Sequence, residues 1–324
     1  MFRLLTKGLA LLALNGALAL VLLSAHRSTL DYAPWETDSV LLVMPEDKPF
    51  GLAILGASHG YLLSRFRENH QILQDTVNRR CFNMAMPTGG GLVPARLYLD
   101  TFYDRGNTAE QVVYFLDPFV FYSAGANDAH KFVYFEPFEP RFLWRLIREG
   151  YPPRRILTYV RAKFSYAWLT QEPAPLIAHP HALTPADVAP ERIARRIETL
   201  YLEGRQEDIF QRYAPEFLRI AGRCRREGSR FVVIIPPTLL GPEPGAAHVL
   251  AWLAEKRAEL GFELHNLVNA MPEPRYYYNL DHLNTAGVAH FCQVYLAPIL
   301  DGSGAPMETT RGPGRQGTGQ DRAE

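Results

Sequence analysis

The sequence predicts an α/β protein, with a doubly wound, three-layer parallel sheet, a helical insertion and one N-terminal transmembrane helix. Short apolar runs bounded by turn residues alternate with segments whose apolar residues recur at helical spacing. A long segment rich in aromatic residues and arginine, about 120–210, separates the third run from the fourth. A stretch without charged residues, Gly8–Ala25, precedes them all. With 47% hydrophobic residues, the chain has enough apolar material for a large core.

The stretch Gly8–Ala25 is long enough to cross a bilayer, because a helix rises about 1.5 Å per residue and would cover roughly 27 Å here. Arg3 and Lys7 precede it, so the positive-inside rule places the N-terminus in the cytoplasm. A cleaved signal peptide is the alternative, but Leu23 stands where a small residue is expected, which favours an uncleaved anchor. Both interpretations export the main domain. We expect a single-pass protein of the inner membrane with a periplasmic domain.

Four segments follow from these patterns. Residues 1–27 form a cytoplasmic tip and the anchor, residues 28–47 a turn-rich stalk, residues 48–300 one α/β domain, and residues 301–324 a disordered tail with too few hydrophobic residues to fold. The 34 basic and 34 acidic residues balance, so no overall field favours nucleic acid as a partner.

The four apolar runs have the length and near-continuous hydrophobicity of parallel strands buried on both faces. They are Gly51–Gly56, Cys81–Met86, Gln111–Asp117 and Arg230–Pro236. Helical patterns lie between them, after Ser58 and over Ala214–Glu227. Strand, helix and strand in this order predict right-handed crossovers and hence a parallel sheet.

The segment 120–210 is interpreted as a helical insertion or lid packed on the domain, because no Gly/Ser linker separates it. The start signal Thr184–Asp187 predicts a helix over about 189–202, with an Arg/Glu-rich face that is expected to be solvated. Trp144 and the aromatic residues of 132–138 and 276–278 fit either a sugar-stacking face or burial under the insertion. Burial of these aromatic residues is the favoured interpretation.

Neither a metal site nor a cofactor site is predicted. Cys81, Cys224 and Cys292 occur in no zinc-binding spacing and are expected to be buried apolar residues. His179-Pro180-His181 supplies two imidazoles without a third ligand at a recognisable spacing, and is interpreted as loop. The chain also lacks the spacing of a Walker or Rossmann phosphate loop.

The candidate site lies at the carboxyl ends of the strands, where open α/β sheets bind their ligands. Ser58 follows the first strand and glycines 89–91 follow the second, while His282 stands in the last loop before the final helix. A histidine can take the proton of a serine hydroxyl and so make it a nucleophile. Backbone N–H groups at Ser58 and in the glycine loop can stabilise an oxyanion. We therefore expect Ser58 and His282 to meet at one edge of the sheet.

These features together resemble the SGNH (GDSL-like) hydrolase superfamily of esterases, lipases and carbohydrate acetyl-transferases or deacetylases. The resemblance rests on Gly56-Ala57-Ser58 after the first strand, the glycine loop, and a near-C-terminal Asp-His-Leu-Asn-x-x-Gly over 281–287. With the N-terminal anchor, the chain looks like exported members of this superfamily that act on cell-envelope polysaccharides. The resemblance covers about 48–300, apart from the insertion.

The resemblance implies Ser58 as the nucleophile and His282 as the general base, with the Ser58 N–H and Gly89 or Gly90 as oxyanion donors. The family places an aspartate three residues before the histidine, and Asn279 stands there instead. Asp281, next to the histidine, is the other candidate partner of the ring. Asn127, in Gly125-Ala126-Asn127-Asp128, comes ten residues later than the family's Gly-x-Asn-Asp and belongs to the site only if the chain loops back. His59 is expected to be a surface or supporting residue.

The expected function is that of a membrane-anchored acyl esterase or O-acyltransferase, acting on an extracytoplasmic carbohydrate through a serine nucleophile. A transferase would have a multi-spanning membrane acyltransferase as a natural partner. Because Asn279 cannot stabilise an imidazolium by charge, the alternative is a catalytically weakened SGNH-like domain that binds glycans or scaffolds an envelope complex.

Overall fold

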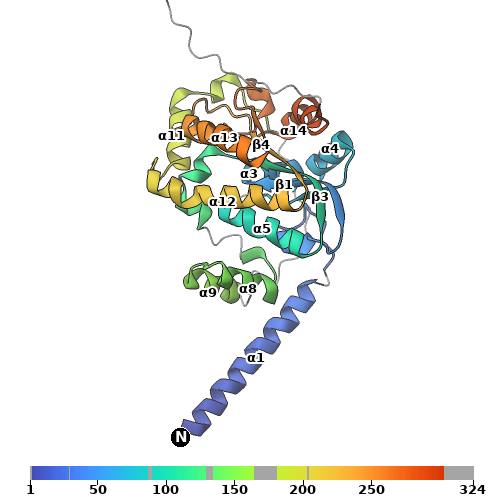
Figure 1. Ribbon diagram of the computed structural model, residues 1–324, viewed down its shortest axis with the longest axis vertical. Coiled ribbons are helices and arrows are strands. Elements are labelled where there is room, and N and C mark those ends of the chain that lie inside the picture. Colours follow the sequence, from blue (N-terminus) through green and yellow to red (C-terminus); the bar gives the residue numbers. More distant parts are fainter. Residues whose placement is uncertain are drawn as a thin grey trace, which may run out of the picture.

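The computed structural model describes residues 2–28, 30–86, 90–128, 134–163, 181–202 and 204–302 (Figure 1). The strands are β1 (Pro49–Gly56), β2 (Cys81–Asn83), β3 (Thr108–Phe115), β4 (Arg230–Ile235) and β5 (Glu263–Asn266). The α-helices are α1 (Phe2–Ser28), α2 (Val40–Val43), α3 (Ser58–Arg65), α4 (Arg67–Val77), α5 (Leu92–Asp104), α6 (Ala124–Asn127), α8 (Pro140–Arg148), α9 (Pro153–Ala162), α11 (Pro190–Leu200), α12 (Glu207–Arg226), α13 (Ala246–Leu260), α14 (Thr285–Phe291) and α15 (Ala297–Leu300). Shorter helical segments are η1 (Pro118–Phe121), η2 (Pro185–Asp187), η3 (Pro274–Tyr276) and the π-helical η4 (Cys292–Leu296).

The five strands are parallel, and their order in the sheet is β2-β1-β3-β4-β5. This is the flavodoxin-like doubly wound order, whose topological switch point lies between β1 and β3. The predicted parallel α/β sheet is therefore confirmed, and the four predicted strands overlap β1 to β4. Strand β5 was not predicted, because its Glu263–Asn266 segment is short, polar and largely half-buried.

Helices cover both faces of the sheet. In β4, Val233 and Ile235 belong to one buried apolar cluster, whereas Val232 and Ile234 belong to a second cluster on the opposite face. This alternation follows from the two-residue period of a strand. Side chains of α5, α12 and α13 complete the first cluster, and those of α3, α4, α14 and α15 complete the second (Figure 1). The sheet is thus the middle of three layers.

Residues 30–47 do not form the stalk that the sequence suggested. Val40, Leu41 and Met44 are buried in the apolar cluster on the α5 face. The fully buried Glu136 accepts hydrogen bonds from the backbone N–H groups of Val40 at 3.0 Å and Leu41 at 2.9 Å. Burial of these apolar side chains makes the segment part of the α/β domain, which therefore begins soon after α1.

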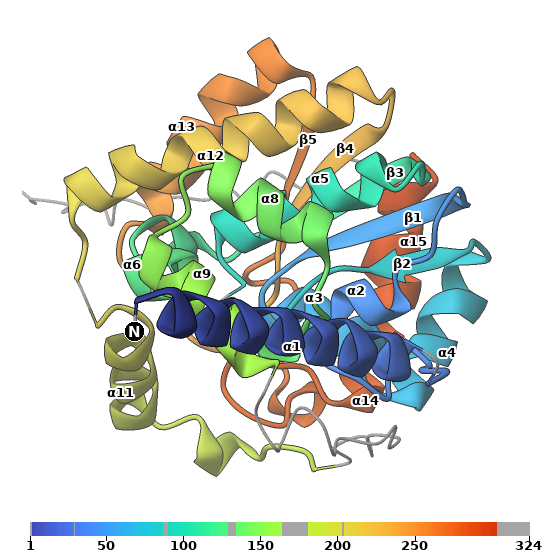
Figure 2. The ribbon, with the colours of Figure 1, turned by 90° about the horizontal axis from the view of Figure 1, so that it is seen from below.

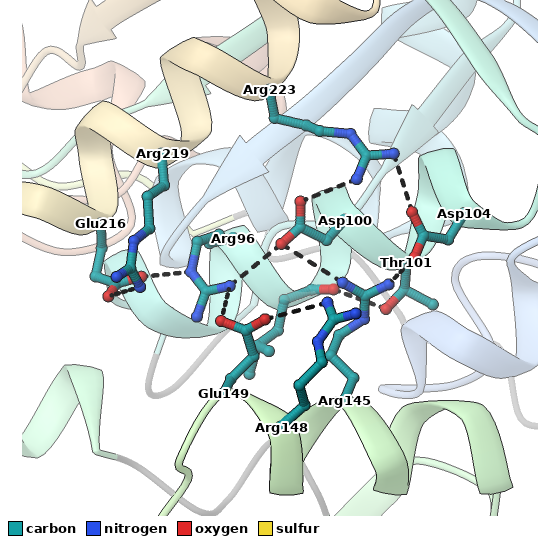
Figure 3. A network of polar contacts seen from close by, with 11 residues as sticks. Arg96, Asp100, Thr101, Asp104, Arg145, Arg148, Glu149, Glu216, Arg219 and Arg223 are labelled. Atoms are coloured by element: carbon teal, nitrogen blue, oxygen red, sulfur yellow. Dashed lines mark hydrogen bonds and ion pairs between the residues drawn. The ribbon is translucent and has the colours of Figure 1, made fainter.

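The predicted insertion contains α8, α9 and α11. The expected Thr184–Asp187 capping box is present, but it closes η2, and α11 begins three residues later at Pro190. Trp144 in α8 is 63% exposed, so its expected burial is wrong. Figure 3 shows charged side chains that join α8 to α5 and α5 to α12. We call this set the arginine network: Arg96, Asp100, Asp104, Arg145, Arg148, Glu149, Glu216, Arg219 and Arg223.

Helix α1 projects away from the domain (Figure 1). Its segment Leu5–Leu22 is long and apolar enough to cross a membrane, and only 6% of it is buried inside the molecule. Figure 2 views the molecule from the side that α1 leaves, where α2, α8 and α9 also lie.

The three cysteines are free and buried, as predicted. The predicted disordered tail lies almost wholly outside the described residues, which end at 302.

Candidate active site

Ser58 stands at the sharp turn between β1 and α3, as its first helical residue. Two residues earlier, Gly56 has a φ of +144°, and a Cβ there would lie 2.6 Å from the carbonyl oxygen of Phe115. Only glycine tolerates both that dihedral and this close approach to the neighbouring strand. The Gly-x-Ser spacing thus has a local cause, since it lets the strand turn directly into a helix whose N-terminus carries the serine.

The predicted pair of Ser58 and His282 is formed. The Oγ of Ser58 and the Nε2 of His282 are 2.6 Å apart, although 224 positions separate the residues along the chain. His282 stands between η3 and α14, in a loop held by a backbone bridge between Tyr277 and Leu283. The His282 side chain is buried, at 6% exposure for the residue. Serine and imidazole are therefore in the arrangement of a nucleophile and its general base.

Asn279 orients the His282 ring from its Nδ1 side, opposite the Nε2 that faces Ser58. Its Oδ1 accepts from the backbone N–H of Asp281 at 3.1 Å and of His282 at 2.8 Å, and lies 3.0 Å from the ring Nδ1. A proton on Nδ1 leaves Nε2 free to accept the proton of Ser58. Asn279 thus occupies both the sequence position and the structural position of an orienting residue, but it contributes no charge.

Asp281 supplies the negative charge that Asn279 lacks. One carboxylate oxygen lies 3.4 Å from the Nδ1 of His282. Arg196 of α11 binds the same carboxylate in a forked contact, with nitrogen–oxygen distances of 2.6 and 3.1 Å. Burial raises the pKa of Asp281, but His282 and Arg196 outweigh burial and hold this pKa far below its usual range. The carboxylate therefore stays charged beside the ring.

His59 and Asp117 form a second buried pair at the topological switch point. The His59 Nδ1 lies 2.6 Å from a carboxylate oxygen of Asp117, which follows β3, and its Nε2 contacts the backbone carbonyl of Asp281. Burial alone would lower the pKa of His59, but Asp117 outweighs it and raises this pKa to about 9. His59 is therefore a buried cation at neutral pH and not a surface residue.

The His282 ring lies between two other rings. The His59 ring stacks on it with centroids 4.9 Å apart, and the Tyr278 ring with centroids 5.7 Å apart. Burial lowers the pKa of His282, and the positive charge of His59 acts in the same direction, while Asp281 opposes both. The net lowering keeps His282 neutral near pH 7, which is the state that a general base requires.

The predicted oxyanion donors are placed differently from one another. Gly90 approaches the turn before Ser58 so closely that a Cβ on it would lie 2.6 Å from the Cα of Ala57, whereas Gly89 lies outside the described residues. Asn127 is fully buried beside the same loop, so the chain does loop back. However, its Nδ2 donates to the carbonyls of Val120 at 2.6 Å and Ser123 at 2.9 Å. Both amide hydrogens are used within the segment 120–127, so Asn127 is not an oxyanion donor in this arrangement. Its Oδ1 accepts from the backbone N–H of Leu92 at 2.7 Å, just after the glycine loop.

Four further side chains near the site, Tyr201, Glu243, Arg196 and Asp117, were not assigned to it from the sequence. Tyr201 donates a hydrogen bond of 3.0 Å to Glu243, and burial together with the charge of Asp117 raises the pKa of Glu243 to about 7. Arg196 was also missed, because its helix was interpreted as a solvated face. Only Asp117 carried a signal in the sequence, since it directly follows a strand.

Within the residues that the structure describes, no group of three or more His, Cys, Asp or Glu side chains is placed to hold a metal ion. Of the His179-Pro180-His181 motif, only His181 is among the described residues.

In comparisons with known proteins, no family model and no curated protein matches the chain. The geometry of Ser58, His282 and their neighbours is therefore the evidence for a function.

Proposed function

We propose that this chain is a membrane-anchored acyl esterase or O-acyltransferase of the SGNH type that uses Ser58 as its nucleophile. The observation that carries the proposal is the 2.6 Å contact between the Ser58 Oγ and the Nε2 of a neutral His282, whose Nδ1 faces Asn279. The lowered pKa of His282 and its burial support the role of a general base.

In the proposed reaction, His282 Nε2 takes the proton of Ser58 while the Oγ attacks an ester carbonyl. The tetrahedral oxyanion is held by the backbone N–H groups of Ser58 and Gly90. The intermediate then breaks its bond to the leaving alcohol, which receives the proton from His282, and an acyl-Ser58 remains. Water or a sugar hydroxyl, deprotonated by His282, attacks this ester in the second half and releases the serine.

The substrate class rests on the resemblance to exported SGNH members, and the anchor α1 supports a position at a membrane. An acyl ester of an extracytoplasmic carbohydrate suits both. If a sugar hydroxyl is the acceptor, the acyl group must reach this side of the bilayer first. A multi-spanning membrane acyltransferase is the partner class that we propose for this supply.

A fluorophosphonate probe tests the nucleophile directly, because it reacts with activated serines. Full-length protein in detergent is expected to be labelled, and Ser58→Ala to lose the label. Ser64→Ala is the matched control, since Ser64 is a buried serine of the same helix, and it should be labelled like the parent. Circular dichroism checks that each variant is folded.

The same experiment addresses a glycan-binding or scaffolding domain without turnover. One observation favours that function: the ring partner is an uncharged Asn279, and the nearby Asp281 is already engaged by Arg196. A folded parent protein that stays unlabelled, while glycans still bind, would overturn the enzyme and support the binding domain.

A further inference from the structure

We infer that the exposed faces of α8 and α9 rest on the anionic headgroups of the membrane that α1 enters. This surface, which we call the α8–α9 face, consists of Arg141, Trp144, Ile147, Arg148, Arg154, Leu157 and Arg161, all of them exposed. It lies far from Ser58 in the sequence and contributes nothing to the proposed reaction.

The exposed residues of α8 form one stripe. Arg141, Trp144, Ile147 and Arg148 follow helical spacing, with Trp144 63% exposed and Ile147 48% exposed. The opposite side of the helix is buried, since Phe142 and Leu146 belong to the apolar core. The helix thus has an inner face that packs on the domain and an outer face of apolar and cationic side chains.

Helix α9 repeats this arrangement. Arg154, Leu157 and Arg161 are exposed at the same spacing, and Leu157 is 57% exposed. Its buried Tyr159 contacts the Phe142 ring edge to face, with centroids 5.8 Å apart, and donates a 2.6 Å hydrogen bond to the carbonyl of Pro137. The two helices therefore present matching outer stripes from one fixed unit.

The arginine network ties α8 to α5 through ion pairs (Figure 3). Arg145 binds Asp104 of α5, and Glu149 receives Arg96 at 3.1 Å, so the inner charges of the segment are paired with the domain. Arg148 is not drawn inward in this way, because its side chain is 61% exposed and pairs with the adjacent Glu149 at 3.3 Å. A docked surface needs this kind of fixed support.

Charge and location identify the partner. Residues 140–163 contain seven basic residues and a single acidic one, Glu149. Tryptophan and leucine beside arginine are the composition of helices that lie in the interface of an anionic bilayer, where the arginine stems pack along acyl chains and the guanidinium groups reach phosphates. Both helices lie on the side of the domain that α1 leaves (Figures 1 and 2). A groove of about 810 Å³ is lined by Ala25 of α1 as well as by Pro140 and Arg141 of α8, which places the start of α8 near the end of the anchor.

Full-length protein in vesicles tests the docking, with an environment-sensitive NBD fluorophore attached at Leu157→Cys. The three native cysteines are buried, so labelling is directed to the new thiol. Val294→Cys is the matched control, an aliphatic side chain that is 47% exposed in η4, next to α14 at the far end of the domain (Figure 1). Vesicles contain phosphatidylcholine alone or phosphatidylcholine with phosphatidylglycerol, and brominated acyl chains serve as the quencher.

We expect the Leu157→Cys label to shift to shorter wavelength and to be quenched by brominated chains in vesicles that contain phosphatidylglycerol, while the Val294→Cys label shows neither effect. Replacing Arg148, Arg154 or Arg161 by glutamine should lower the ratio of docked to undocked protein about fivefold for each residue, from the attraction of one basic side chain to an anionic surface. High salt should act in the same direction.

Two results would overturn the inference. One is a Leu157→Cys label that stays as water-exposed as the control in both kinds of vesicle, or that responds equally in both. The other is a label that is shielded from water but not quenched by lipid bromine, which would assign the α8–α9 face to a protein partner. Circular dichroism verifies that the labelled variants are folded, and substitutions at exposed positions leave the core unchanged.

Discussion

Two clusters of polar side chains in the described part of the chain use charge in different ways. The candidate active site joins Ser58, His282, Asn279, Asp281 and His59 at the switch point of the sheet. The arginine network joins α5, α8 and α12 at a distance from it, with ion pairs of Arg96 to Glu149 at 3.1 Å and of Arg223 to Asp104 at 3.0 Å (Figure 3). In the network, each acidic group contacts arginine and is neutralised by it.

In the candidate active site, the His282 imidazole is neutral although its neighbours are charged. His282 is buried and lies between the His59 cation and the Asp281 carboxylate, which Arg196 also binds. Burial, helped by the His59 and Arg196 cations, outweighs the attraction of Asp281, so the pKa of His282 is lowered and its Nε2 remains available to Ser58. In the arginine network, each acidic side chain is paired with arginine, and these ion pairs hold helices together. Around His282 the charges do not stabilise the imidazolium enough to protonate it, which leaves a neutral imidazole beside Ser58.

The largest expected effect on activity is that of His282→Gln. Loss of the base should reduce acyl-ester hydrolysis by about a thousandfold or more, as for members of a serine triad. Steady-state kinetics of the purified protein measures it. A variant that keeps a tenth of the parent rate would show that the buried imidazole of His282 has a structural role and is not the general base.

Asp281→Asn should have the next largest effect. It removes the negative charge near the imidazolium and leaves Arg196 without its carboxylate, while Asn279 still holds the ring. We expect kcat/KM to fall about ten- to a hundredfold, less than the roughly ten-thousandfold loss of a triad aspartate whose side chain also sets the tautomer. Arg196→Lys, which keeps the charge, should lose clearly less. Equal losses in the two variants would contradict the role given to the carboxylate.

His59→Gln should shift the pH dependence with a smaller change in the maximum rate. The pKa of His282 is lowered, so the parent should lose activity only below the ordinary histidine pKa of 6.5, as the base becomes protonated. Removing the stacked cation raises the pKa of His282, and the acid limb of kcat/KM should move to higher pH. An unchanged acid limb would exclude His59 as a determinant of this pKa.

The smallest expected effect on activity is that of Glu216→Gln in the arginine network. It removes a partner of Arg96, whose side chain is only 6% exposed, so the free energy of unfolding should fall by about 1–3 kcal/mol. Urea unfolding measures this loss, and kcat/KM should stay within about twofold of the parent because the reacting groups are untouched. A large loss of activity at unchanged stability would erase the distinction between the two clusters.

Much of the fold was predictable from local patterns. The continuous apolar runs of β1, β3 and β4 are visible because both sheet faces are buried, and Gly56-Ala57-Ser58 is visible because the turn requires glycine. The uncharged run of α1 and the pairing of Ser58 with His282 were predicted in the same way, the latter from the rule that loops at the carboxyl ends of parallel strands meet.

The electrostatic setting of His282 was decided by tertiary structure alone. Arg196 comes from an insertion helix whose sequence indicates a solvated face, and His59 becomes a buried cation only because Asp117 arrives beside it from β3. The packing of residues 40–44 into the core and the use of both Asn127 amide hydrogens depend on contacts with distant segments in the same way. A sequence pattern reports the period of burial along one element, whereas a pKa or a hydrogen bond depends on distances between elements, which exist only after the chain has folded.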